Sequence, residues 1–253
     1  THRLSSAASD VYKRQLKEVY KSSPFGVVSS FLIGISHSAV FSLIAVYATS
    51  MNFSILEVSI VTFLFAISGA ISQWPIGKLS DVLDRRIVII YTTFGAALFC
   101  FLAIISSGQM YMPAGLATSK IFFYICIMCF SFCSLPMFAL IFAHTNDFIP
   151  KEKFVAAGAG LQFVFGLGAI CGPFMCSLFM EFLGENGFFI FLIIFHSFIG
   201  LFGIYRMQIR ESGDNPDSQF APMPQTITPA GIELNPSTEP IDEPNNLNEF
   251  KKI

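Results

Sequence analysis

The stretch IVIIYTTFGAALFCFLAIISSGQMYMPAGLATS, residues 87–119, contains no charged side chain. A helix that rises 1.5 Å per residue needs about 20 apolar residues to cross the hydrocarbon of a bilayer. Similar charge-free stretches occupy 22–56, 58–77, 121–146, 154–180 and 186–205. None alternates as a membrane β-strand does, so each predicts a helix. We expect an all-α membrane protein, a six-transmembrane-helix bundle with helices at 25–49, 55–76, 87–107, 120–143, 154–180 and 187–206.

The composition of the chain agrees with a membrane protein. Hydrophobic residues make up 53% of the 253 residues, charged residues only 13%, and the mean hydropathy is +0.63. A soluble domain is about a quarter charged. The net charge of −2 does not indicate nucleic-acid binding. Cys126, Cys129 and Cys133 share one helix face without a fourth ligand in reach, so we predict no metal site and no cofactor.

The basic residues orient the predicted helices. Lys120 is the one residue among the 15 lysines and arginines that falls on the side opposite the two termini. Basic residues gather on the cytoplasmic side of bacterial inner-membrane proteins. We therefore expect a multi-pass protein of the inner (plasma) membrane, with both termini of this chain in the cytoplasm and the lipid bilayer as its surroundings.

The two ends of the chain read differently from the bundle at 25–206. Residues 1–15 resemble the translation of a sequencing-library transposon adaptor, so we interpret them as a cloning scar, with a genuine polar segment as the alternative. Residues 16–24 would then be a cytoplasmic linker. Residues 207–253 are rich in proline and acidic side chains and poor in aliphatic ones, which predicts a disordered cytoplasmic tail.

The loop GKLSDVLDRR, residues 77–86, joins the second and third predicted helices. A loop this short makes the two helices antiparallel neighbours. We expect the second helix to end near Pro75, Gly77 to permit a tight exit, and Asp81 to accept hydrogen bonds from free N–H groups at a helix N-terminus.

The same loop carries a pair of arginines. Arg85 and Arg86 are expected to face the anionic leaflet of the membrane or to pair with acids such as Asp81 and Asp147. An ordinary basic loop of the kind that sets topology explains the arginine pair equally well.

Two further signals concern helix packing and bending. The fifth predicted helix carries a stripe on which a second helix can approach closely, and its small residues recur every fourth position: Ala156, Gly160, Val164, Gly168 and Gly172. Pro173 then removes one backbone donor and allows a bend. Pro136 is expected to kink the fourth helix.

These motifs resemble those of the major facilitator superfamily. Its signature loop, Gly-x-Leu-(Ala/Ser)-Asp-x-x-Gly-Arg-(Arg/Lys), is matched at Gly77, Leu79, Ser80, Asp81, Arg85 and Arg86. Val82 and Asp84 depart from it, which makes this loop similar to the weaker copy between helices eight and nine of the family's twelve. Gly168, Gly172 and Pro173 resemble the family's Gly-x-x-x-Gly-Pro motif, and the likeness covers roughly residues 16–235.

The resemblance implies that this chain is the C-terminal six-helix half of a facilitator-type secondary transporter, with a missing N-terminal six-helix half as its partner. Such a protein moves a small solute by alternating access and is not an enzyme. Asp81, Arg85 and Arg86, with Asp147, would form a cytoplasmic gate. An ion gradient would supply the energy, and a proton is one candidate for the coupling ion.

Polar side chains inside the apolar stretches are candidates for the substrate or proton pathway. His37 lies at the centre of the first helix, where an imidazole is costly and often functional, although a neutral histidine bonded to a neighbour is equally consistent. Gln162 lies opposite the glycine stripe and either lines a cavity or links helices. For His196, in the last helix, packing or a local hydrogen bond is the expected role.

Two other functions remain open from the sequence. A Ser68–His196 pair would suit a rhomboid-like intramembrane serine hydrolase, although Ala66 replaces the first glycine of the Gly-x-Ser-Gly motif. An isolated half could also be a non-transporting membrane scaffold, or could act as a dimer of halves. The substrate, the coupling ion and the direction of transport cannot be inferred.

Overall fold

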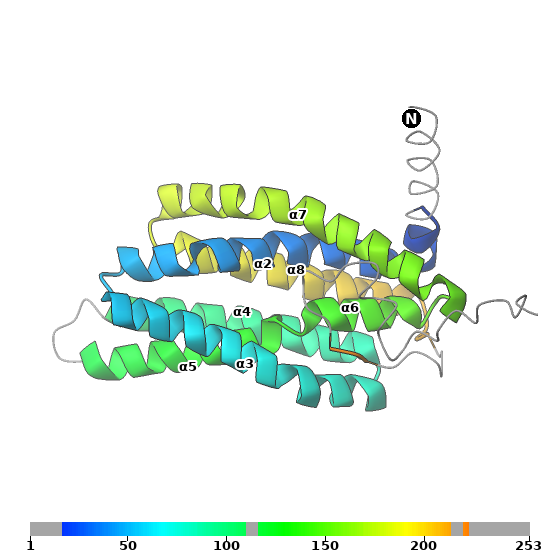
Figure 1. The fold of residues 1–253 in the computed structure, drawn as a ribbon, viewed down its shortest axis with the longest axis horizontal. Coiled ribbons are helices and arrows are strands. Elements are labelled where there is room, and N and C mark those ends of the chain that lie inside the picture. The colour runs from blue at the N-terminus through cyan, green and yellow to red at the C-terminus, as the bar shows by residue number, and fades with distance from the viewer. Residues whose placement is uncertain (1–16, 110–115, 214–219, 223–253) are drawn as a thin grey trace, which may run out of the picture.

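A computed structural model describes residues 17–109, 116–213 and 220–222. Helices run side by side along the long axis of the molecule, and these residues contain no strand (Figure 1). Six helical segments are long and apolar enough to span a membrane. The predicted six-helix fold is confirmed. The elements are α2 (Pro24–Ser50), α3 (Ile55–Val82), α4 (Arg85–Gln109), α5 (Leu116–Ser134), α6 (Met137–Asn146), the 3-10 turn η1 (Lys151–Lys153), α7 (Phe154–Leu183) and α8 (Gly187–Ile209).

Side-chain caps fix where the first two spans begin. Pro24 occupies the first turn of α2, where a missing N–H costs nothing, and the Ser23 hydroxyl accepts from the N–H of Gly26 at 3.2 Å. Ser54 and Glu57 form a reciprocal capping box at the start of α3. The expected starts at residues 25 and 55 therefore agree with the structure to within one residue.

The predicted end of the second span is wrong. α3 runs through Pro75 to Val82, and only Leu83 and Asp84 separate it from α4. A proline removes one hydrogen bond from a helix, and the surrounding spans can tolerate that loss. Gly77 therefore lies within α3 rather than at an exit from it.

The fourth span is interrupted at the expected proline. α5 ends at Ser134, and α6 begins at Met137 after Leu135 and Pro136. Together α5 and α6 complete one membrane-length segment, Lys120–Asn146. The interruption leaves the last carbonyls of α5 without partners inside their own helix, so they must bond elsewhere.

Glycines bring α2 and α7 into backbone contact along a seam. A Cβ at Gly168 would lie 2.2 Å from the carbonyl oxygen of Phe31, and a Cβ at Gly172 would lie equally close to that of Ile35. Gly34 of α2 meets the carbonyl oxygen of Phe165 in the same way. Close approach of this kind strengthens packing between apolar helices in a bilayer. α7 passes through Pro173 as a single helix.

Many of the phenylalanines fill the core at the end of the bundle away from the Gly77–Arg86 segment. The ring of Tyr47 stacks on Phe188 and Phe123 at centroid distances of 5.2 and 6.0 Å and meets Phe189 edge-on at 4.9 Å. At the same end, Lys120 Nζ lies 2.6 Å from an oxygen of Glu57, which ties α5 to α3.

Candidate functional site

Two histidines are buried where α2 and α8 face α5. His37 is 1% exposed and His196 is fully enclosed. Phe165 of α7 and Phe130 of α5 pack edge-on against these rings, with centroids 6.3 Å from His37 and 5.6 Å from His196. Buried imidazoles need hydrogen-bond partners, because an unsatisfied polar group inside an apolar bundle is costly.

Ser134, the last residue of α5, connects the two histidines. Its hydroxyl oxygen lies 3.2 Å from His37 Nε2 and 2.8 Å from His196 Nε2. Its carbonyl oxygen lies 3.1 Å from His37 Nε2. One serine therefore bridges residues that lie on different spans and are far apart in the sequence.

The partners of the rings give the hydrogen bonds a direction. His196 Nδ1 lies 2.9 Å from the carbonyl oxygen of Leu192, which can only accept, and 3.3 Å from the hydroxyl of Ser36, which can also accept, so we place the hydrogen on Nδ1. In the neutral ring Nε2 is then an acceptor, and the Ser134 hydroxyl donates to it. The same hydroxyl accepts from the N–H at His37 Nε2. A continuous hydrogen-bonded chain runs from α2 through the fourth span to α8.

The break in the fourth span explains why Ser134 can play this part. A serine within an uninterrupted helix tends to bond its own backbone one turn earlier. Ser134 ends α5, so its carbonyl needs a partner outside the helix, and His37 supplies that donor. The sequence signal was a polar residue two positions before Pro136, which the prediction of a kink did not exploit.

Of the other candidates, His196 belongs to this hydrogen-bonded chain, whereas Gln162 lies beside it on α7. His196 makes the expected local hydrogen bond to Leu192 and, in addition, joins His37 through Ser134. Gln162 is half-buried on α7, one turn before Phe165, whose ring packs on His37. The hydrolase pair is not assembled, since the Ser68 hydroxyl donates to the carbonyl of Met128 at 2.6 Å.

A second polar cluster lies where the C-terminal end of α3 meets the start of α4. Arg85 is 7% exposed and donates to Asp81 at 2.9 Å and to Asp147 at 3.0 Å. Asp147 follows α6, so one guanidinium joins the α3–α4 connection to the end of the fourth span. A buried arginine held by two carboxylates is far less screened than a surface ion pair.

Arg86 makes a different set of contacts. It lies 2.7 Å from an oxygen of Asp84 and also donates to the backbone carbonyl of Arg210, just beyond α8, at 2.6 Å. Asp84 lies between the spans. Burial raises its pKa, but the hydrogen bonds and positive charge of Arg86, with a hydrogen bond from Ser212, together outweigh burial. The pKa of Asp84 therefore lies below its ordinary value.

Phe220, from the segment after α8, completes this cluster. Its N–H donates to the carboxylate of Asp81 at 2.9 Å, and its ring lies against Gly77. The segment 77–86, Asp147 and Phe220 are thus one contact network. Gly77 provides the open space for the ring rather than the tight exit predicted for it, and the contribution of Phe220 was not foreseen.

Comparison with known proteins identifies the kind of chain that carries these clusters. The sequence profile described as Major Facilitator Superfamily matches residues 26–240. The chain is 23% identical over 201 residues to an uncharacterised MFS-type transporter of Yersinia enterocolitica, serotype O:8 / biotype 1B, which covers 79% of the chain and 47% of that protein. It is 27% identical over 186 residues to the uncharacterised MFS-type transporter YfkF of Bacillus subtilis (strain 168), covering 70% and 44% respectively.

A third relative also matches most of this chain but less than half of its own length. An uncharacterised MFS-type transporter of Enterobacter sp. (strain 638) is 24% identical over 191 residues, which are 76% of the chain and 45% of that protein. The chain thus spans less than half the length of these curated relatives. No solved structure gives a significant match to it.

Proposed function

Because the chain belongs to the major facilitator superfamily, a family that points to a transporter rather than an enzyme, we propose that it is the C-terminal six-helix half of a secondary transporter. The complete protein moves a small solute across the membrane by alternating access, driven by an ion gradient. The chain aligns with less than half the length of each relative, which supports its assignment to one half of a transporter.

The observation that carries the proposal is the hydrogen-bonded chain His37–Ser134–His196. Ionisable side chains within membrane spans commonly form proton relays. Here two imidazoles are bridged by one hydroxyl, which can accept a proton from one ring while passing its own to the other. We assign these three hydrogen-bonded residues to the proton pathway and propose the proton as the coupling ion. Gln162, on the neighbouring α7, is a candidate substrate contact.

The Arg85 cluster is proposed as the cytoplasmic gate. Asp81 and Asp147 hold Arg85 from two different spans, so breaking either pair would let the ends of those spans part. Asp81→Asn is expected to alter transport rates with little loss of stability, because Asp81 is partly exposed and Arg85 keeps Asp147. Unchanged transport kinetics in the complete transporter would contradict the gate role.

The arrangement in the membrane follows from the same proposal. The basic end of the bundle faces the cytoplasm, with both termini of the chain on that side of the inner membrane. The missing N-terminal half would supply the other wall of the substrate site. In this arrangement residues 1–15 are an adaptor-derived scar, and the segments before Pro24 and after Ile209 are a cytoplasmic linker and a cytoplasmic tail.

A proton-flux measurement tests the proposal. Everted membrane vesicles are prepared from cells that express the chain, either alone or together with an N-terminal six-helix half. A pH-sensitive dye such as ACMA then reports the gradient while a panel of neutral and zwitterionic solutes is added. A solute that discharges the gradient only in vesicles with both halves supports half-transporter function.

The matched variants are His37→Gln and Ser38→Ala. His37→Gln removes a titratable ring from the proposed pathway and should abolish solute-dependent proton movement. Within the described part of the chain, the hydroxyl of the neighbouring Ser38 donates only to the Ile35 carbonyl of its own helix, so Ser38→Ala should retain solute-dependent proton movement. Equal activity of His37→Gln and the unaltered chain would refute the pathway, and activity of the chain alone would favour a dimer of halves. The scaffold alternative gains support if no solute moves protons.

A further inference from the structure

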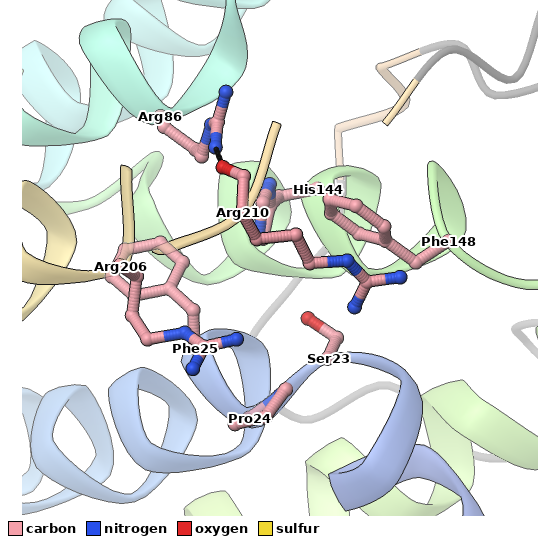
Figure 2. Close-up of a pocket in the computed structure, with 8 residues that line it drawn as sticks. All are labelled: Ser23, Pro24, Phe25, Arg86, His144, Phe148, Arg206 and Arg210. Atoms are coloured by element: carbon pink, nitrogen blue, oxygen red, sulfur yellow. Dashed lines mark hydrogen bonds between the residues drawn. The ribbon is translucent and has the colours of Figure 1, made fainter. Parts of the chain in front are cut away.

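A recess opens at the basic end of the bundle, between the start of α2, the end of α6 and the end of α8 (Figure 2). It measures about 240 Å³ with open solvent included, and its sheltered part has room for at most about one water molecule. The lining residues are Ser23, Pro24, Phe25, Arg86, His144, Phe148, Arg206 and Arg210.

Three guanidinium groups meet around this recess. Arg86 is paired with Asp84, and it donates to the Arg210 carbonyl, as Figure 2 shows. Within the described part of the chain, neither Arg206 nor Arg210 has a carboxylate partner. Arg210 is held in place instead by the ring of Phe148, 4.1 Å away, and by the carbonyl of Ser22. The recess therefore carries more positive than negative charge.

The beginning of α2 adds to this positive potential. α2 is a long helix, and its first N–H groups carry the positive end of its dipole. Pro24 has no N–H, and Ser23 accepts from Gly26 with its hydroxyl and from Val27 with its carbonyl. The N–H of Phe25, a residue that lines the recess, is therefore the donor of the first turn that no described residue satisfies. Helix N-termini of this kind bind phosphate and carboxylate groups.

His144 is a second, independent observation that points to a ligand in the recess. It is 3% exposed and lines the recess, held edge-on between the rings of Phe25 and Phe148 at centroid distances of 5.1 Å. No described residue hydrogen-bonds either ring nitrogen. Because His144 lines the recess, its ring N–H can donate to an acceptor placed there.

We propose that this recess binds a phosphate group. One phosphate oxygen would lie in the recess near His144 and the start of α2, and the remaining oxygens would lie at the mouth against Arg206 and Arg210. Arginine pairs well with phosphate because its planar fork can donate two parallel hydrogen bonds. The group belongs either to an anionic phospholipid at the membrane surface or to free phosphate. Either would tie together the ends of α2, α6 and α8, independently of transport.

Two arms of one experiment distinguish these sources. In the first, the full chain is extracted from vesicles of phosphatidylcholine with added phosphatidylglycerol, and native mass spectrometry measures which lipid stays bound. In the second, lipid-free chain in detergent is titrated with inorganic phosphate while its thermal stability is followed. Arg206→Gln is the test variant, because Arg206 has no ion-pair partner among the described residues whose loss would disturb the fold. Lys78→Gln, an exposed cation that lies over Trp74, is the control.

Arg206→Gln is expected to weaken binding about fivefold, the effect of one basic residue near an anionic surface. Lys78→Gln should leave binding unchanged. Retention of phosphatidylglycerol that depends on Arg206 assigns the site to a lipid, whereas Arg206-dependent stabilisation by inorganic phosphate alone assigns it to the free ion. The proposal is overturned if neither ligand binds, or if Arg206→Gln and Lys78→Gln have the same effect on both.

Discussion

The ring of Phe220 occupies the space that a side chain at Gly77 would need. A Cβ at position 77 would lie 2.2 Å from Cδ1 of that ring, which is far inside van der Waals contact. The N–H of the same phenylalanine donates to Asp81, one turn further along α3. Two residues of the family's signature loop thus hold a segment that follows the last span, in addition to any role within the loop itself.

Gly77→Ala is therefore expected to release Phe220. The added methyl group pushes the ring away, and the hydrogen bond between the Phe220 N–H and Asp81 is lost with it. Hydrogen exchange measured by mass spectrometry should show faster exchange in the peptide that contains Phe220. Gly166→Ala provides the control, since nothing lies within 4 Å of a Cβ at that position. Unchanged exchange in Gly77→Ala would show that the contact does not protect the amide.

The glycine seam gives a second pair of matched variants. Gly168→Ala places a methyl group 2.2 Å from the backbone oxygen of Phe31, and a backbone atom cannot rotate away as a side chain can. α2 and α7 must separate, and we expect a loss of about 1–3 kcal/mol in stability. Gly166→Ala, in the same helix, should be neutral or stabilising by up to about 1 kcal/mol, because alanine is the better helix former. Reversible unfolding in mixed micelles would measure both changes, and equal effects would contradict backbone contact at the seam.

Ser134→Ala tests the hydrogen-bonded chain by stability alone. It removes the hydroxyl that serves both rings, and leaving a buried polar group unpaired costs about 1–3 kcal/mol. Ser38→Ala is expected to stay within about 0.5 kcal/mol of the unaltered chain. In a double-mutant cycle, Ser134→Ala and His196→Gln should couple by about 0.5 kcal/mol or more, because they share one interaction. Strict additivity would mean that the 2.8 Å contact contributes nothing.

Protonation of Asp84 is expected to make the stability of the folded chain depend on pH. The pKa of Asp84 is lower in the folded chain than in the unfolded one, because the hydrogen bonds and charge of Arg86 and a hydrogen bond from Ser212 together outweigh burial. Its contribution to stability is therefore complete above the unfolded pKa of about 3.9 and is lost as the pH falls through the lower folded pKa.

Asp84→Asn should cost about 1–2 kcal/mol at neutral pH, since hydrogen bonds to charged groups are worth more than neutral ones. It should also flatten the melting temperature measured between about pH 5 and pH 3. Glu18→Gln breaks an exposed pair with Lys153 and is the control, with an expected change below about 1 kcal/mol. An unaltered acid dependence in Asp84→Asn would exclude this carboxylate as its source.

The spans could be predicted because a bilayer leaves the chain few choices. Backbone groups in hydrocarbon must bond within their own segment, so length and absence of charge suffice to locate helices. The charged residues then mark the connections, which is why Arg85 and Asp147 could be named as partners before their distance was known. The end of α3 was misplaced, because Pro75 was expected to end the helix, whereas a proline removes one hydrogen bond and a membrane helix can continue through it.

Contacts between distant segments could not be predicted from pattern. Nothing in the sequence says that Ser134 faces both His37 and His196, since that depends on the rotation of three helices about their axes. Phe220 was overlooked for a different reason. It stands in a segment too polar to build a core, yet a single ring needs only a groove floored by one glycine. Composition describes the average of a segment and misses one anchored residue.

The seam between α2 and α7 also limits how this bundle can deform. Because the carbonyl oxygens of Phe31 and Ile35 abut Gly168 and Gly172, the two helices cannot slide along each other without first pulling apart. We therefore expect α2 and α7 to move together as one rigid unit. Bending costs least instead at Leu135 and Pro136, where helical bonding is already broken, and this break lies beside the serine that bridges the two histidines.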